Sequence, residues 1–225
     1  MILALETSGA RGSVALCDGA TVLGLRCFDT RQEAVRRLPP VIGELLEAHG
    51  RESLEAVAVS RGPGSWNGLR VGMALAKALA HALRLPVIGV PTPQAWAAET
   101  AARWPAHPVA VVQPSRRDYV YLTVFAPGAV GAALLGPVVV EVAGLEEGLA
   151  GPVATGDWPD LSAWVATRRG VILDAERAVS PSAVTVARLA ERELGQVTED
   201  SYYTLRPEYV SPSQAERNRG VSLGL

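Results

Sequence analysis

The stretch SRGPGSWNGLRVGMALAKALAHAL, residues 60–83, has the pattern of a strand end, a glycine-rich turn and a long helix. Phosphate-binding loops share this layout, because the free amides at a helix N-terminus attract anions. Here no Lys-Ser or Lys-Thr closes the loop, and its glycines do not follow the G-x-G-x-x-G spacing. Lys77, the only lysine in the chain, lies about three turns into the helix, too far along to reach a phosphate. The sequence therefore favours a loop that keeps the shape of a phosphate site without its chemistry.

The glycine-rich turn requires residues that bend sharply and then start a helix. Gly-Pro-Gly makes a sharp turn, and Ser65 or Asn67 offers a side-chain cap to the first helical amides. The residues that we expect to shape the loop are Gly62, Pro63, Gly64, Ser65 and Gly68.

The helix that follows is apolar around most of its circumference. Small residues recur every four positions and form a ridge that lets another backbone come close. They are Gly68, Gly72, Ala76 and Ala80. Polar residues occupy a narrow stripe, which consists of Arg70, Lys77, His81 and Arg84. Such a helix has to be covered on more than one side, by its own sheet and by a neighbouring helix, a partner protein or both.

The segments around this stretch give the element order βββαβαβα for the first half of the chain. Residues 1–6, 12–19 and 21–28 read as three antiparallel strands, with a turn near Asp18 that pairs Cys17 with Val22 and favours no disulfide. Residues 30–50 read as a helix with a Thr30/Glu33 capping box, a kink or break at Pro39-Pro40 and a glycine C-cap. Further strands are predicted at 54–60 and 85–90, and a further helix at 92–104.

The second half repeats this order loosely, with shorter helices. Strands are predicted at residues 109–115, 119–125, 137–142 and 152–156, and helices at 145–150 and 180–195, the last capped by Ser180. We therefore predict an α/β protein of two sequential domains. The first spans residues 1–104 and carries the long helices, and the second spans 105–225, is degenerate and ends in a polar tail.

Composition excludes several classes of protein. A net charge of −2 leaves no overall electrostatic footprint for nucleic acid. The three histidines lack zinc-protease spacing, and no nucleophile elbow is present, so we predict no catalytic, metal or cofactor site. The sequence shows neither a signal peptide nor an apolar run of membrane-spanning length, which predicts a cytoplasmic protein with no membrane contact. Tyr202, Tyr203 and Tyr209 have no basic surround in the sequence and are interpreted as packing residues.

Glu6, which precedes Thr7-Ser8-Gly9 at the first turn, leaves two readings open. An acidic residue at the end of a first strand suits a metal-nucleotide site, and it equally suits a side chain that caps its own turn.

Three segments carry a resemblance to a known family. ILALETSGARGSVALCDG, RGPGSWNGLRVGMALAKALAHALRLPVIGV and RPEYV resemble the TsaB (YeaZ) family, bacterial proteins needed to make threonylcarbamoyladenosine in tRNA. The resemblance is nearly continuous over about the first 95 residues, a length comparable to a domain. It implies an actin-like ATPase fold with two ribonuclease-H-like βββαβαβα domains. It also implies a non-catalytic scaffold that pairs with TsaD, the metal-binding transferase that modifies the adenosine next to the anticodon.

The resemblance implies further partners as well. TsaE, a P-loop ATPase, joins the complex in this family, tRNA is contacted only indirectly, and a homodimer forms when TsaD is absent. Its helices would then meet TsaD in a bundle. The residues predicted for this interface are Leu38, Val41, Ile42, Leu45, Leu69, Met73, Ala76, Lys77 and Ala80. A charge at Met73 or Ala76 is predicted to abolish pairing and to leave the fold intact.

Some positions depart from the family pattern. Glu6 replaces the usual aspartate, Trp66-Asn67 replaces Phe-Thr, and Pro114 stands where an aspartate falls, while Arg116 is kept. These changes count against a nucleotide site. The alternative function is an actin-like-fold enzyme that binds ATP through Glu6, Ser8 and residues 62–68.

Overall fold

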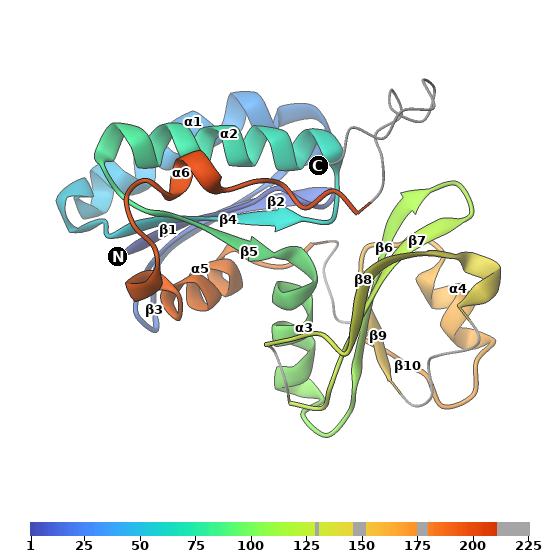
Figure 1. Cartoon of the computed structure of the whole chain (residues 1–225). Coiled ribbons are helices and arrows are strands. Elements are labelled where there is room, and N and C mark those ends of the chain that lie inside the picture. The colour runs from blue at the N-terminus through green and yellow to red at the C-terminus, as the bar shows by residue number, and fades with distance from the viewer. Residues whose placement is uncertain (129–130, 146–151, 175–179, 211–225) are drawn as a thin grey trace.

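The chain builds the same five-stranded sheet twice, once in each of two lobes (Figure 1). The computed structural model describes residues 1–128, 131–145, 152–174 and 180–210, with the backbone alone for residues 31–35. The first sheet has the order β3 (Thr21–Asp29), β2 (Arg11–Asp18), β1 (Ile2–Glu6), β4 (Ala56–Gly62) and β5 (Val87–Pro91). The second has the order β8 (Leu135–Glu141), β7 (Tyr119–Phe125), β6 (Val109–Arg116), β9 (Val153–Thr155) and β10 (Ile172–Leu173).

Strand directions also repeat between the sheets. In each lobe the first three strands pair antiparallel and the last two join parallel to the central strand. This confirms the predicted α/β, actin-like class with its duplicated ribonuclease-H-like plan. The predicted pairing of Cys17 with Val22 is also confirmed, and both cysteines are free thiols, since Cys27 lies opposite Ser13 instead.

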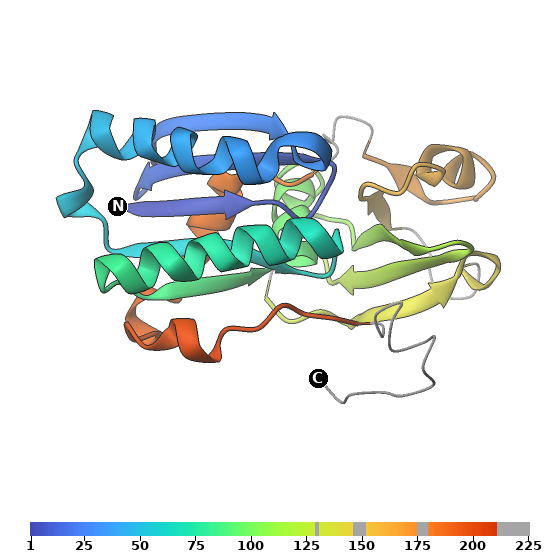
Figure 2. The ribbon, with the colours of Figure 1, turned by 90° about the horizontal axis from the view of Figure 1, so that it is seen from above.

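Helices cover both faces of the first sheet. α1 (Thr30–His49) and α2 (Trp66–Leu83) lie on one face, and α5 (Ala183–Glu191) lies on the other (Figures 1 and 2). The alternation of β1 explains both layers, because Leu3 and Leu5 pack toward α1 and α2 while Ala4 packs toward α5. The structure thus adds a contribution from the end of the chain to the lobe that was predicted to end at residue 104.

Helix boundaries follow most of the predicted signals. Gly50 ends α1 with a φ of 79°, and its amide donates to the carbonyl of Leu46 at 2.9 Å, as a C-cap glycine should. Of the predicted kink or break at Pro39-Pro40, the break is wrong, since α1 runs through both prolines, whose side chains are exposed, and the kink stays a prediction. The predicted cap of Glu33 lies outside the described side chains.

The α5 cap requires a correction. Ser182, not Ser180, is the N-cap, and its hydroxyl accepts from the amide of Val184 at 3.2 Å. Ser180 lies before Pro181 and outside the helix, where its hydroxyl accepts from the amide of Arg11 at 3.3 Å.

The second lobe has a thin helical layer. Its helix between β9 and β10 is α4 (Leu161–Ala166), and among the described residues between β8 and β9 the 3₁₀ turn η2 (Val142–Gly144) is the one helical element. The helix predicted at residues 145–150 lies almost wholly outside the described residues. α3 (Thr92–Arg103) joins the lobes, since Trp96 and Ala97 pack against Val109 and Phe125 of the second sheet.

The end of the described chain returns to the first lobe. After the 3₁₀ turn η3 (Leu194–Gln196), α6 (Ser201–Thr204) and the residues up to 210 run beside β5 and α2 in both views (Figures 1 and 2). The amide of Val87 donates to the hydroxyl of Ser201 at 2.8 Å, and the amide of Glu208 donates to the carbonyl of Arg61 at 2.7 Å. Among the described helices, none is long and apolar enough to span a bilayer.

Candidate functional site

The glycine-rich loop is packed against the turn between β1 and β2. The amide of Ser65 donates to the carbonyl of Ser8 at 2.6 Å. A Cβ on Gly64 would lie 2.5 Å from that same carbonyl oxygen, and a Cβ on Gly68 would collide with the carbonyl oxygen of Thr7. Both glycines are therefore needed so that two backbones can approach. The chain's own first turn fills the space beneath the loop.

The loop has the conformation predicted for it. Gly62 has a φ of 108°, which favours glycine, and the Gly62–Pro63 peptide is cis. Ser65 caps α2, and its hydroxyl accepts from the amide of Gly68 at 3.3 Å. Gln113 of β6, a residue that the sequence analysis did not single out, donates to the carbonyl of Pro63 at 3.1 Å. This buried amide ties the loop to the second lobe.

Glu6 is buried completely and serves its own turn. Its carboxylate accepts from the amide of Ser8 at 2.6 Å, from the hydroxyl of Ser8 at 2.5 Å and from the hydroxyl of Ser60. Burial raises the pKa of the Glu6 carboxyl, and these hydrogen bonds partly oppose that rise. Of the two readings left open by the sequence, the geometry is that of a capping side chain. In the described parts of the chain, no cluster of three metal-ligating side chains is found.

The residues predicted to meet a partner need a correction. Seven of the nine are buried inside the chain itself, so their side chains are not available at the surface. They are Leu38, Ile42, Leu45, Leu69, Met73, Ala76 and Ala80. Val41 and Lys77 are half-buried. The physical reason is that the sheet, α1 and the returning residues 201–210 already cover most of the apolar circumference of α2.

The surface that α1 and α2 do present is small and apolar. Ala74 and Ala78 are exposed on α2, Val71 and Leu75 beside them are half-buried, and Val41 of α1 is half-buried nearby on the same side of the sheet. We call these five residues the α1–α2 face.

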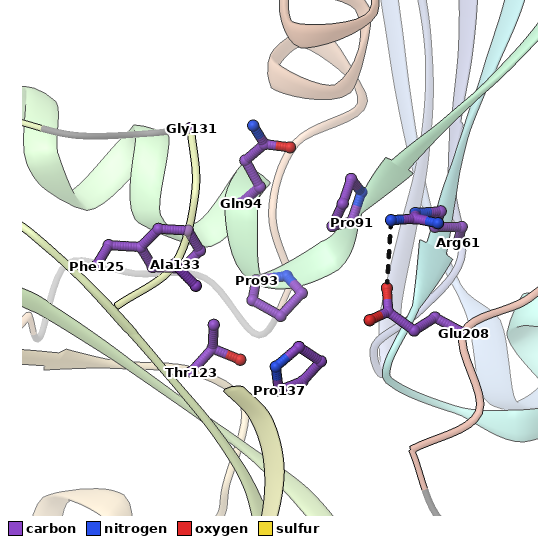
Figure 3. A pocket seen from close by; sticks show the side chains of 10 residues that line it. All are labelled: Arg61, Pro91, Pro93, Gln94, Thr123, Phe125, Gly131, Ala133, Pro137 and Glu208. Atoms are coloured by element: carbon purple, nitrogen blue, oxygen red, sulfur yellow. Dashed lines mark ion pairs between the residues drawn. The ribbon is translucent and has the colours of Figure 1, made fainter. Parts of the chain in front are cut away.

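A pocket of about 150 Å³ opens between the lobes (Figure 3). The rings of Pro93 and Pro137 lie in its middle, and Phe125 lies on the side away from the ion pair between Arg61 and Glu208, whose nearest N and O atoms are 3.7 Å apart. None of the described residues that line it is a cysteine or a histidine. Its chemistry is apolar contact beside one ion pair, which does not assemble a nucleophile with a base.

Comparison with known proteins places this geometry in a family. The family described as "TsaD: tRNA N6-adenosine threonylcarbamoyltransferase" matches residues 29–152, more than half of the chain. An uncharacterised protein of Mycobacterium tuberculosis is 34% identical over 157 residues, which are 68% of this chain and 71% of that one. The tRNA threonylcarbamoyladenosine biosynthesis protein TsaB of Escherichia coli is 38% identical over 93 residues, 40% of each chain.

Solved structures agree over a longer stretch. A Pseudomonas aeruginosa protein described as similar to the peptidase YeaZ superposes with a TM-score of 0.78 at 25% identity, over 93% of this chain and 99% of that one. YeaZ from Pseudomonas aeruginosa gives 0.75 at 25% identity, over 92% and 98%. The family model spans the glycine loop and α2, and the sequence relatives and solved structures agree with it, so the chain belongs to the TsaB (YeaZ) family.

Proposed function

We propose that this protein takes part in the biosynthesis of tRNA threonylcarbamoyladenosine as a non-catalytic subunit that binds TsaD and supports threonylcarbamoyl transfer. The observation that carries the proposal is the closed loop. Glu6 is buried under three hydrogen bonds, and the glycine turn rests on the chain's own backbone. Such a loop holds its shape, and it offers neither an open carboxylate to a metal nor an open anion site to a phosphate. The similar TsaB proteins are named for the biosynthesis of tRNA threonylcarbamoyladenosine, which supports the assignment to this pathway.

TsaD would bind at the α1–α2 face. Ala74 and Ala78 are small and exposed, so a partner helix can approach the α2 backbone closely. Val41, Val71 and Leu75 surround them with half-buried apolar area, which a partner would cover completely. In the absence of TsaD, a second copy of the chain would use the same face, and TsaE would join the heterodimer.

Binding of ATP by the chain alone is the second candidate, and the geometry counts against it. Of the groups that it would use, Glu6 and Ser8 are buried and hydrogen-bonded to each other, and the loop of residues 62–68 packs against the chain's own first turn. Isothermal titration with Mg-ATP separates the two candidates, since the proposed subunit gives no heat by itself.

The decisive experiment is light scattering of the full chain mixed with TsaD from the same organism. We expect a one-to-one complex, which Ala78→Arg disrupts while the thermal melt of the chain stays unchanged. Ala102→Arg, at an exposed position of α3, is the matched control and should pair normally. In a strain depleted of its TsaB, the wild-type chain and the control should restore threonylcarbamoyladenosine in tRNA, as measured by nucleoside mass spectrometry. Separate elution of the two proteins, with or without TsaE and ATP, overturns the proposal.

A further inference from the structure

The polar stripe of α2 lies beside the tyrosines at the end of the chain. At the N-terminal end of α2, the rings of Trp66 and Tyr209 are stacked with their centroids 4.1 Å apart. The guanidinium carbon of Arg70 lies 5.9 Å from the centroid of the Trp66 ring. Residues 202–209 therefore place an aromatic ring and a cation together on the flank of this helix.

The C-terminal end of α2 shows a second group of the same kind. The ring of His81 lies 4.8 Å from that of Tyr202, which in turn lies 4.3 Å from the ring of Tyr203. Arg206 donates to the carbonyl of Tyr203 at 2.5 Å. Desolvation, and next the neighbouring charge of Arg206, lower the pKa of Lys77. Two cations are thus held near each other beside three rings.

The two groups form one continuous surface, which we call the α2–tail strip. Its members are Trp66, Arg70, Lys77, His81, Tyr202, Tyr203, Arg206 and Tyr209. Those on α2 fall on one side of the helix, since successive members are four, seven and four residues apart. At 3.6 residues per turn these spacings are close to one, two and one turns. From Trp66 to His81 the strip is about 23 Å long at 1.5 Å per residue.

The charge of the strip is not compensated by the described residues. None of Arg70, Lys77 and Arg206 has an ion pair with a carboxylate in the described part of the chain. Glu208, the carboxylate next to the strip, is paired with Arg61, and Glu199 and Asp200 lie beyond Tyr202 at its far end. A chain with a net charge of −2 therefore gathers unpaired cations on one surface. The basic surround that the sequence did not give the tyrosines is supplied by the fold.

We propose that the α2–tail strip binds single-stranded RNA, with its cations on the phosphates and its exposed rings on the bases. Cations interleaved with aromatic rings are the usual means of holding single strands, because every base has a face on which a ring can stack. The exposed rings are those of Trp66, which is 38% exposed, and Tyr203, which is 64% exposed. An acidic protein surface would use the cations and leave these rings unoccupied. The proposal rests on the proposed function only for the choice of tRNA as a probe.

The test measures binding of the full chain, alone and with TsaD, to unmodified tRNA and to an unstructured 12-nucleotide RNA between 50 and 200 mM salt, a range of about fourfold that resolves a salt slope. Removing three phosphate contacts should reduce the slope of log affinity against log salt by about 2, at about 0.7 for each contact with a single strand. The strip variant is Arg70→Gln, Lys77→Gln and Arg206→Gln. The control variant, with the same change of charge, is Arg26→Gln, Arg51→Gln and Arg169→Gln at exposed positions away from the strip.

Stacking has a separate signature. Tyr203→Ala should weaken binding of the short RNA about tenfold with the salt slope unchanged, since it removes a ring and no charge. If the triple strip variant fails to fold by circular dichroism, Arg206→Gln alone serves, because that guanidinium is exposed and bonds only to backbone carbonyls.

Each outcome decides one claim. A reduced slope in the strip variant with an unchanged slope in the control supports the RNA proposal. Equal effects of the two triple variants, or no RNA binding by chain or complex, overturn it. Loss of TsaD or TsaE binding in the strip variant with RNA affinity unchanged also overturns it, because the strip is then a protein surface. Failure of the proposed function is seen separately, as absence of a TsaD complex by light scattering.

Discussion

The two lobes share a sheet and differ in what covers it. After the third strand, the first lobe has α1 with 20 residues, whereas the second, as far as the structure describes it up to residue 145, has η2 with 3. Between the fourth and fifth strands, the first lobe has α2 with 18 residues where the second has α4 with 6. The order and direction of the strands are nevertheless the same in both. Strand pairing therefore preserves the plan, while the helices set what each lobe can present to a partner.

The last long helix of each half, α3 or α5, packs against the sheet of the other half. α3 follows the first sheet and packs against β6 of the second, and α5 follows the second sheet and packs against β1 and β2 of the first. Each sheet is completed in part by the other half of the chain. The lobes are unequal in helices and still dependent on each other.

The largest expected effect tests whether α2 is a core element or a free face. Met73→Glu should cost about 4 kcal/mol of unfolding free energy, since Met73 is buried and its site offers the carboxylate no partner. Ala78→Glu, on the exposed side of the same helix, should change stability by less than about 0.5 kcal/mol. Urea denaturation measures both. Equal stability of the two variants would mean that α2 does not pack as described.

The next effect compares two glycines within helices of the first lobe. Gly68→Ala should cost about 3 kcal/mol, because the new methyl group meets the backbone of Thr7, which cannot give way like a side chain. Gly43→Ala in α1 should instead stabilise the chain by about 0.5–1 kcal/mol, because nothing lies within 4 Å of its added Cβ. In thermal melts, Gly68→Ala should lower the melting temperature and Gly43→Ala should raise it. Two shifts of the same sign would contradict the close packing of loop and turn.

A smaller effect tests the link between the lobes. Gln113→Leu should cost about 1–2 kcal/mol, since it removes the buried donor to the carbonyl of Pro63 and leaves that oxygen without its side-chain partner. Gln196→Leu, at an exposed position, is the matched control and should have little effect. Hydrogen exchange at the glycine loop should speed up only in the first variant.

The last effect appears as a pH dependence of stability and concerns the carboxyl of Glu6. Its pKa is raised in the folded state, so the native chain holds a proton that the unfolded chain releases above its ordinary pKa of 4.5. That contribution to stability is complete below pH 4.5 and is lost as the pH rises through the folded pKa, with a slope of at most about 1.4 kcal/mol per pH unit. Glu6→Gln should flatten this part of the profile, whereas Glu47→Gln on the surface of α1 should not. Identical profiles for wild type and Glu6→Gln would show that the carboxyl is not desolvated.

The fold was predictable because its signals are local. Asp18-Gly19 fixes the first hairpin and its register, and Ser65 and Gly50 mark helix ends with their own chemistry. The break expected at Pro39-Pro40 is absent because tertiary packing overrides local propensity: Leu38 before the pair and Ile42 after it are both buried in the core.

The candidate site was predictable only in part, because its partners are distant in sequence. The loop glycines could be identified from their spacing, but Gln113 is one polar residue in a strand, with no local signal that it reaches Pro63. The interface residues were misplaced for a related reason. Periodicity shows that a helix is apolar all round but not which side its own chain covers, and here the end of the chain covers one of them.

The position of α5 has a consequence for synthesis. The ribosome makes the first sheet early, but Ala183, Val186 and Ala187, which cover one of its faces, are made about 80 residues later than the end of α3. At 5–20 residues per second this delay is on the order of ten seconds. During that time the nascent chain exposes an apolar sheet face that includes Ile2 and Ala4. Until α5 has been made, the nascent chain therefore exposes apolar surface that the finished protein buries.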